Sequence, residues 1–267
     1  MKRIDEYGNT LFSDFYKKEF IEEFTKHGSV IIENVLSPEF IKKTIKELEF
    51  ALEKEIEFQG TKDYSYYGYV LSNAIYGGSF LDLFDNEKVV QPINSIMGEG
   101  SIAYSYTSSS MPPFKGNDSS HIHVDCPIFL SEYLLRMGVL IPLVDLTFDN
   151  GATYYLHGSH KTEETPCEQE FLKKSKRLVV KAGTAWFFNT RLWHMGGKNN
   201  TKNWRHALTI NICRPWMKQR IDIPALMKNM DLSKVSDQAK QKLGFYSQVP
   251  RSYEEYFNPS DTPRIFI

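Results

Sequence analysis

From Ser101 to Ser110 the chain reads SIAYSYTSSS, a stretch in which larger and smaller side chains alternate from Ile102 onward. Alternation of this kind is typical of a β-strand with one buried face. Further short runs rich in apolar residues follow, separated by Gly, Asn, Asp and Pro, at Leu134–Leu143, Ala152–Leu156, Leu178–Val180, Ala185–Phe188 and Ala207–Cys213. Many short strands divided by turn residues predict a β-sandwich or β-barrel core.

Helix signals dominate on both sides of this core. Residues 37–39 (SPE) form a helix start, because a capping hydroxyl precedes a proline and an acid in the first turn. This helix is expected to run to about Phe58, and another is expected over 80–97. A strand is predicted at 29–35, and the tail from Met217 is expected to be helical again.

The chain has 267 residues, which is long enough to bury a full core, and no linker divides it. We therefore expect a single domain over 1–267, with a helical part at 1–100, a β core at 101–216 and a helical tail at 217–267. Residues 161–177 are highly charged and are expected to form a surface excursion with a short helix.

Composition excludes several classes of protein. Lys and Arg number 32 against 33 Asp and Glu, so there is no basic field for nucleic-acid binding. The 3 cysteines show no CxxC spacing, which excludes a disulfide framework and a zinc ribbon and favours a reducing compartment. No signal peptide and no apolar run of membrane-spanning length is visible. We expect a cytoplasmic protein that binds neither nucleic acid nor membrane.

Histidines gather in two short clusters, HIHVD at 121–125 and LWH at 192–194. In an extended segment His123 and Asp125 point to the same face, because side chains alternate. With His194 from a distant strand they match the 2-His-1-carboxylate arrangement, which suits non-haem Fe(II) and leaves coordination positions open. The pattern also leaves open a two-histidine site of cupin or zinc type that includes His121.

Arg205 follows the second cluster and begins the predicted strand 205–211. A guanidinium is a planar fork that grips a carboxylate with two hydrogen bonds and keeps its charge when buried. At this place it can bind the far carboxylate of a metal-chelating 2-oxo acid. The alternative is an ordinary surface arginine at the end of a strand.

The segment NGATYYLHGSHK at 150–161 resembles the signature of the phytanoyl-CoA dioxygenase family, in which NG is followed by PGSHK. The HxD motif, the LWH segment and Arg205 stand in that family's order and spacing. The resemblance covers about 101–216 and extends more loosely to the flanking helices. Two positions depart from it: His157 replaces the usual Pro, and Gly183-Thr184 stands where the family often has Gly-Asp.

The resemblance implies a double-stranded β-helix, a jelly-roll or cupin-like core, and an enzyme that uses Fe(II), 2-oxoglutarate and O2. It implies that His123, Asp125 and His194 are the iron ligands and that Arg205 binds the C5 carboxylate of 2-oxoglutarate. Neither departure falls on a ligand position. The family uses the segment with His157 and His160 structurally, so we expect no catalytic role for these two.

The implied reaction is hydroxylation of an unactivated C–H bond of a small metabolite or natural-product intermediate, with release of succinate and CO2. Related halogenases have a small residue where Asp125 stands, which makes room for a halide on iron; Asp125 therefore favours hydroxylation. Desaturation, cyclisation and epimerisation use the same oxidising chemistry and stay open. A free small molecule is the expected partner, because no CoA or carrier-protein signature is present.

Residues around the predicted iron are pocket candidates. Thr107 and Ser109 share one face of the first strand and are candidates for hydrogen bonds to the cosubstrate, or are ordinary hydroxyls on a β surface. The Tyr-rich segment 64–76 is a candidate lid, with packing between helix and barrel as the alternative. The candidates for the substrate pocket are Tyr66, Tyr67, Tyr69, Arg136 and Trp216.

Two functions of other classes stay open. One is a non-catalytic, cupin-like metal- or ligand-binding protein, which needs neither Arg205 nor open metal positions. The other is a zinc hydrolase built on His121, His123 and His194. Metal analysis together with succinate formation separates these functions from the oxygenase.

Overall fold

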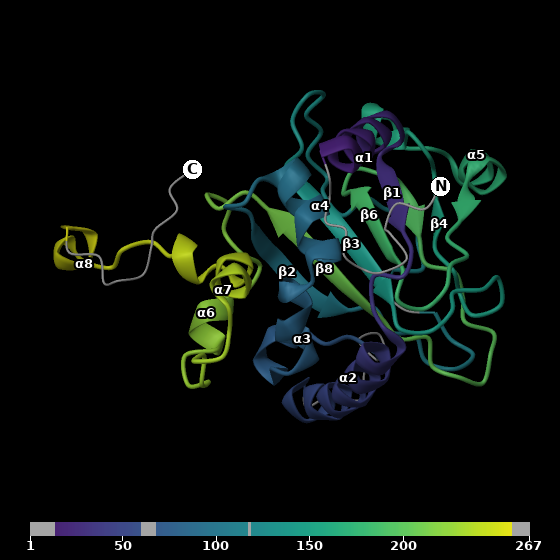
Figure 1. Cartoon of the computed structure of the whole chain (residues 1–267). Helices are drawn as coiled ribbons and strands as arrows, with labels where there is room; N and C mark the ends of the chain where they lie inside the picture. Colours follow the sequence, from purple (N-terminus) through teal and green to yellow (C-terminus); the bar gives the residue numbers. More distant parts are fainter. Residues whose placement is uncertain (1–13, 60–67, 117–118, 258–267) are drawn as a thin grey trace.

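The computed structural model describes residues 14–59, 68–116 and 119–257, and its centre is formed by two antiparallel sheets (Figure 1). The larger sheet consists of β1 (Ser29–Ile32), β2 (Ile102–Ser108), β3 (Arg136–Pro142), β6 (Ala185–Asn189) and β8 (Ala207–Cys213). The smaller consists of β4 (Tyr154–Tyr155), β5 (Lys176–Arg177) and β7 (His194–Met195). The strand orders are β1-β6-β3-β8-β2 and β5-β4-β7.

The predicted mainly β core is confirmed, with two corrections to its strands. Strand β1 ends at Ile32, earlier than predicted, because the chain leaves the extended conformation at Asn34, whose φ is 54°. The strand predicted at 178–180 is wrong: pairing with β4 occurs at Lys176–Arg177. The apolar run reflects burial of Leu178 in the core, since its neighbours make only an isolated bridge there.

One face of the larger sheet packs against the hydrophobic core, and the other lines a cleft. Alternation along each strand decides which residues point to which face. On β8, Leu208, Ile210 and Ile212 belong to the main hydrophobic core. Thr209 and Asn211, which lie between them in sequence, line a cleft on the opposite face. One face of the sheet is therefore sealed by helices, and the other is open to a functional site.

Helices cover the apolar face, as Figure 1 shows for the purple and blue elements. They are α1 (Asp14–His27), α2 (Pro38–Gln59), α3 (Ser79–Asp82) and α4 (Glu87–Met97). The prediction of a helix starting at residues 37–39 is confirmed by α2. Phe20 of α1 meets Phe187 of β6 edge to face at 5.4 Å, one of the contacts that fix the helices on the sheet.

The single helix predicted over 80–97 is wrong, because the chain breaks at Asn86 between α3 and α4. Asn86 is extended (φ −81°, ψ 107°), and its side chain accepts a hydrogen bond from the Lys88 N–H. A capping side chain of this kind satisfies an N–H that the new helix leaves free. The apolar periodicity continues across the break and conceals it in the sequence.

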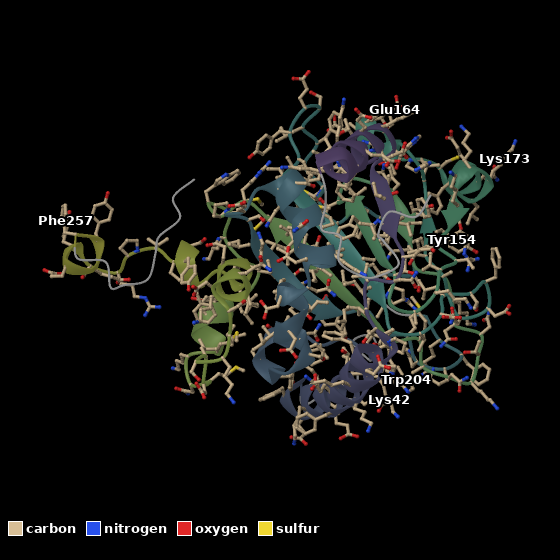
Figure 2. All side chains as sticks on the ribbon, viewed as in Figure 1. Lys42, Tyr154, Glu164, Lys173, Trp204 and Phe257 are labelled. Carbon is tan, nitrogen blue, oxygen red and sulfur yellow. The ribbon has the colours of Figure 1, made fainter. Side chains whose placement is uncertain are left out.

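The remaining helices are α5 (Glu168–Lys174), α6 (Ile223–Leu226), α7 (Asp237–Leu243) and α8 (Tyr253–Phe257). The first of these confirms the short helix expected within 161–177. The last stands away from the two sheets, with Phe257 at its end (Figure 2). No helix among the described residues is long and apolar enough to span a membrane.

Candidate metal centre

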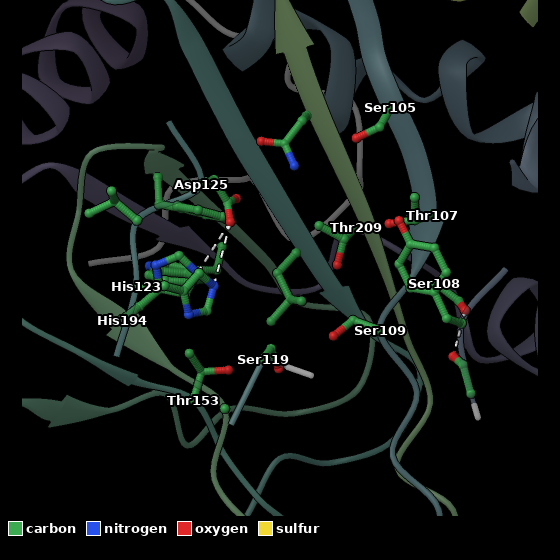
Figure 3. Close-up of a pocket in the computed structure, with 18 of the residues that line it drawn as sticks. Ser105, Thr107, Ser108, Ser109, Ser119, His123, Asp125, Thr153, His194 and Thr209 are labelled. Carbon is green, nitrogen blue, oxygen red and sulfur yellow. Dashed lines mark hydrogen bonds and ion pairs between the residues drawn. The ribbon is translucent and has the colours of Figure 1, made fainter. Parts of the chain in front are cut away.

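His123, Asp125 and His194 come together beside the cleft (Figure 3), and we call them the triad. Oδ1 of Asp125 lies 3.6 Å from Nε2 of His123 and 3.7 Å from Nε2 of His194. Ligand atoms that share one metal ion at about 2.1 Å stand about 3–4 Å apart. All three ligand atoms lie within 4.8 Å of one another, so the triad has the geometry to hold one ion.

Main-chain pairing places the two histidines side by side. The His123 N–H donates to the His194 carbonyl at 2.9 Å, and the His194 N–H donates to the His123 carbonyl at 3.0 Å. The two rings lie 4.2 Å apart between centroids. Asp125 follows His123 by two residues in the extended segment, which turns its carboxylate to the same side.

Each histidine of the triad is held in one tautomer. Nδ1 of His123 lies 2.8 Å from the His121 carbonyl, and Nδ1 of His194 lies 2.9 Å from the Leu192 carbonyl. A carbonyl oxygen only accepts hydrogen bonds, so each Nδ1 carries the proton. When such a ring is neutral, its lone pair is on Nε2, the atom that faces Asp125. Such outer hydrogen bonds typically orient metal-binding histidines.

Burial and neighbouring groups set the protonation states of His194 and Asp125. Burial lowers the pKa of His194 to about 4, so its ring is neutral at pH 7. Burial acts to raise the pKa of Asp125, but its interactions with His123, His194 and Arg136 lower it overall. Neutral imidazole and ionised carboxylate need lose no proton to bind a cation.

Arg136 supports Asp125 from outside the cleft. Nη2 of Arg136 donates to the Asp125 carbonyl, and the guanidinium lies over the Tyr104 ring at 4.3 Å. The expectation that Arg136 lines the substrate pocket is therefore corrected: it is not among the residues around the cleft. Its position at the start of β3 brings the buried side chain against the segment that carries Asp125 instead.

The cleft beside the triad has a volume of about 430 Å³. Hydroxyl side chains of β2 and β8 line one side of the cleft (Figure 3). The aromatic side chains of Trp186 and Phe188 from β6 line it as well. In addition to the triad, the lining side chains include Tyr69, Ser105, Thr107, Ser109, His121, Leu140, Thr153, Trp186, Phe188, Thr209, Asn211 and Arg220.

The pocket residues expected from the sequence divide into three groups. Thr107, Ser109 and Tyr69 line the cleft. Trp216 does not: it is 64% exposed, because the chain has already left the sheet after Cys213 at the end of β8. Tyr66 and Tyr67 lie outside the described residues.

Arg205 is buried without enough hydrogen-bond acceptors. Its side chain is 1% exposed, and its Nε and Nη1 have no hydrogen-bond partner among the residues that the structure describes. It lies two residues before β8, where it bridges Met111. Alternation along this extended segment puts it on the same side as Thr209 and Asn211, although Arg205 is not itself among the residues that line the cleft. Burial lowers its pKa to about 10, which still leaves it charged at pH 7. A buried, charged and unsatisfied guanidinium requires an acceptor, and a carboxylate matches its fork.

Sequence reasoning missed several polar residues that line the cleft, among them Ser105, Thr209, Asn211 and Arg220. The alternation of β2 and β8 contains the signal for the first three. Ser105 stands two residues before Thr107 on β2, and Thr209 and Asn211 stand two residues apart on β8, so each lies on the cleft-facing side of its strand. No pattern marks Arg220, which reaches the cleft from the segment after β8.

The histidines that the triad does not use are placed differently. His121 lines the cleft but does not belong to the triad; its carbonyl holds the His123 ring. His27, His157 and His160 form a separate α1 histidine group, in which the rings of His27 and His157 stack at 4.4 Å. Within the described parts of the chain, only the triad brings three metal-binding side chains together.

Comparison with known proteins places this geometry in a family. Residues 24–207, more than half of the chain, match the model of the phytanoyl-CoA dioxygenase (PhyH) family. An uncharacterised protein of Mycobacterium tuberculosis is 27% identical over 191 residues, which cover 70% of each chain. A dioxygenase of Alternaria alternata is 25% identical over 257 residues, which cover 87% of this chain and 83% of the relative.

Solved structures share the fold at low sequence identity. ThoJ, a non-haem monooxygenase, superposes with a TM-score of 0.62 at 18% identity, over 76% of this chain and 80% of ThoJ. HygX of Streptomyces hygroscopicus, solved with nickel and 2-oxoglutarate bound, superposes with a TM-score of 0.58 at 13% identity, over 78% of this chain and 90% of HygX. The chain belongs to the phytanoyl-CoA dioxygenase family.

Proposed function

We propose that this protein is an Fe(II)- and 2-oxoglutarate-dependent dioxygenase that hydroxylates an unactivated C–H bond of a small molecule. The observation that carries the proposal is that two groups on one side of the larger sheet each call for a ligand: the triad for a metal ion, and Arg205 for an anion. The triad offers three ligand atoms close together, with His194 neutral and the pKa of Asp125 lowered. Arg205 offers a buried charge with unsatisfied N–H groups.

The residues present fit the proposed metal. Two neutral imidazoles and one carboxylate form the facial set that non-haem Fe(II) oxygenases use, and this set leaves positions for a chelating 2-oxo acid and for O2. Bound iron, 2-oxoglutarate and O2 together supply the oxidising power, with succinate and CO2 released. In this proposal the strands at 101–216 form a jelly-roll core, with β1 added at one edge of the larger sheet, within one domain over 1–267.

The protein's own residues bind and orient the cosubstrate. Arg205 takes the C5 carboxylate of 2-oxoglutarate, which satisfies the N–H groups that the fold leaves unpaired. Thr107 and Ser109 line the cleft and donate hydrogen bonds to the same molecule. Trp186 and Phe188, stacked at 4.2 Å, close the floor and exclude water from the metal.

Asp125 decides between oxygenation and halogenation in this proposal. Its carboxylate occupies the ligand position that a halide would need, so the product should contain oxygen and no chlorine. Product formed under ¹⁸O2 in chloride buffer is analysed by mass spectrometry. One labelled oxygen supports hydroxylation, and loss of two hydrogens without label supports desaturation or cyclisation. A chlorinated product from the wild type would show that Asp125 is not a ligand.

The experiment that tests the proposed function is a metabolite screen for stimulated succinate release with Fe(II), 2-oxoglutarate and O2. The wild-type protein should release succinate, and His194→Ala should not, because it lacks one of the three ligands. His157→Ala is the matched control, because it removes an imidazole outside the triad. Iron bound without any 2-oxoglutarate turnover would favour a non-catalytic binding protein instead.

A further inference from the structure

The cleft is lined by an arginine, Arg220, that lies at a different place from Arg205. Among the described residues that line the cleft, Arg220 is the only one with a permanent positive charge. It is exposed to solvent, whereas Arg205 is fully buried. It also lies outside residues 24–207, the part that matches the family. Membership of the family therefore assigns it no role.

The position of Arg220 is fixed by the edge of the larger sheet. The pairing of β2 with β8 shifts between Ala103 and Ser105, which leaves Tyr104 as a bulge. The Tyr104 carbonyl accepts a hydrogen bond from the Arg220 N–H at 2.9 Å. The neighbouring Gln219 side chain donates to the Ala103 carbonyl at 2.8 Å. A bulge of this kind re-aims the chain next to a site, and here it holds Arg220 at the cleft.

Tyr69, from a second segment that bonds to β2, contacts the guanidinium. Nη1 of Arg220 donates to the Tyr69 hydroxyl at 2.9 Å. Tyr69 is itself held on both sides, because the Gly68 carbonyl and the Val70 N–H both bond to the Ser108 hydroxyl at 2.8 Å. The pair is therefore built from two fixed main-chain segments that lie 151 residues apart in sequence.

The wall next to this pair is polar and incompletely satisfied. Ser105 of β2 lies opposite Asn211 of β8 in the sheet, and both line the cleft. Oδ1 of Asn211 is buried and has no hydrogen-bond partner among the described residues. A buried polar atom without a hydrogen-bond partner destabilises a folded protein, so this wall is suited to a ligand that forms hydrogen bonds.

This polar wall and Arg205 lie at opposite ends of the same strand face. Asn211 follows Arg205 by six residues, which corresponds to about 20 Å along a strand. One molecule of 2-oxoglutarate bound at Arg205 and the triad does not extend over that length. Arg220 and Arg205 therefore serve two different molecules.

We propose that Arg220 and Tyr69, with Ser105 and Asn211, form the anchor for the substrate, and that the substrate is a small hydroxylated molecule with an oxyanion group. Arg220 binds the oxyanion, a carboxylate or a phosphate monoester, through its remaining N–H groups. Tyr69 orients the guanidinium, and the serine and asparagine bind hydroxyl groups. The inference rests on the proposed function, because it defines the substrate of the same site.

Binding to the Ni(II)-loaded protein with saturating 2-oxoglutarate tests this anchor. The probes are small hydroxylated carboxylic acids and phosphate monoesters, each paired with its uncharged amide or alcohol, and melting temperature reports binding. At least one acid should bind the wild type ten times more tightly than its uncharged partner. Arg220→Gln should remove that preference, and Arg220→Lys should restore part of it. Lys218→Gln, which removes an exposed charge two residues away, should leave it unchanged.

The outcomes separate the anchor from the proposed function. Affinity for 2-oxoglutarate is measured in the same variants and should stay within twofold in Arg220→Gln. Failure of the wild type to bind Ni(II) or 2-oxoglutarate would overturn the proposed function. Normal 2-oxoglutarate binding overturns the anchor in two cases: no acid binds more tightly than its uncharged partner, or Arg220→Gln keeps the preference. Comparing the carboxylates with the phosphate monoesters shows which oxyanion the anchor takes.

Discussion

The triad and the α1 histidine group contain the same kind of side chain, yet only one is built to hold a metal. In the triad, main-chain carbonyls fix both Nδ1 protons, and both Nε2 atoms face one carboxylate. In the α1 histidine group, the His27 and His157 rings stack face to face. Lone pairs lie in the plane of a ring, so stacked rings do not direct them at a shared point.

The partners of the two groups also differ in charge. The Lys176 ammonium donates to Nδ1 of His157 at 3.2 Å, which uses the lone pair that a metal would need. Nε2 of His160 bonds to the Thr25 carbonyl. The His160 ring also lies against Gly28, so closely that a Cβ on this glycine would be 2.3 Å from Nδ1 of His160. The comparison teaches that the oriented lone pair and the carboxylate make a metal site, and that clustering of histidines does not.

The largest expected effect is loss of metal binding when one side chain of the triad is removed. His194→Ala and Asp125→Ala should each abolish Ni(II) or Fe(II) binding and turnover, because each removes a ligand. His157→Ala should bind metal as the wild type does. Isothermal titration with Ni(II) measures the affinities. The comparison would break if His157→Ala lost the metal, or if His194→Ala bound it normally.

Arg205→Lys should have the next largest effect, on the cosubstrate rather than the metal. Lysine keeps the charge but loses the fork, so a charge-assisted hydrogen bond worth about 1.5–3 kcal/mol is lost. The apparent KM for 2-oxoglutarate should rise about tenfold or more, with Ni(II) affinity unchanged. An unchanged 2-oxoglutarate affinity in Arg205→Ala would show that the buried guanidinium serves another group.

Much of this site could be predicted because it depends on local alternation. His123 and Asp125 share a face since they are two residues apart. Arg205 is an even number of residues before Thr209 and Asn211, the residues of β8 that line the cleft. Their roles as iron ligands and cosubstrate anchor stay predictions that these variants test. The β-strand-rich centre could also be predicted, because short apolar runs separated by turn residues are typical of β-strands.

Features that depend on distant packing could not be predicted. Asn86 divides one apolar periodicity into two helices, and nothing in that periodicity marks the break. The sequence predicts that Arg136 is a pocket residue, but in the folded chain its guanidinium bonds to the Asp125 carbonyl. Arg220 comes to the cleft from the segment after β8, where its N–H donates to the Tyr104 carbonyl at a bulge of β2. In each case the partner is set by tertiary structure.

Arg136→Met should weaken metal binding without abolishing it. The methionine keeps the bulk of the side chain but cannot donate to the Asp125 carbonyl, so the carboxylate is held less firmly. Loss of an outer hydrogen bond typically costs 10–100-fold in metal affinity, and we expect about tenfold here. Arg214→Met is the matched control, because Arg214 also donates to a main-chain carbonyl, that of Met97. Equal Ni(II) affinities in the two variants would refute the role of Arg136.

The smallest expected effect is on stability and belongs to the α1 histidine group. Burial, with the charges of Lys176 and His27, lowers the pKa of His157 to about 4. In the unfolded chain this pKa is about 6.5. Between these values the unfolded chain binds a proton that the folded chain does not, so the free energy of unfolding falls as the pH falls from about 6.5 to about 4. Above pH 6.5 the residue contributes no pH dependence.

His157→Phe tests this contribution, because phenylalanine keeps the stacked ring beside His27 and removes the titration. Urea unfolding of the metal-free protein is measured at pH 7 and pH 5 for both chains. His194 also has a lowered pKa of about 4, but it titrates in both chains and cancels in the difference. The variant should lose less stability than the wild type on going to pH 5, and Ni(II) affinity at pH 7 should be unchanged. An equal loss in both chains would mean that His157 is as easily protonated in the folded protein as in the unfolded one, and the two histidine groups would then differ in geometry alone.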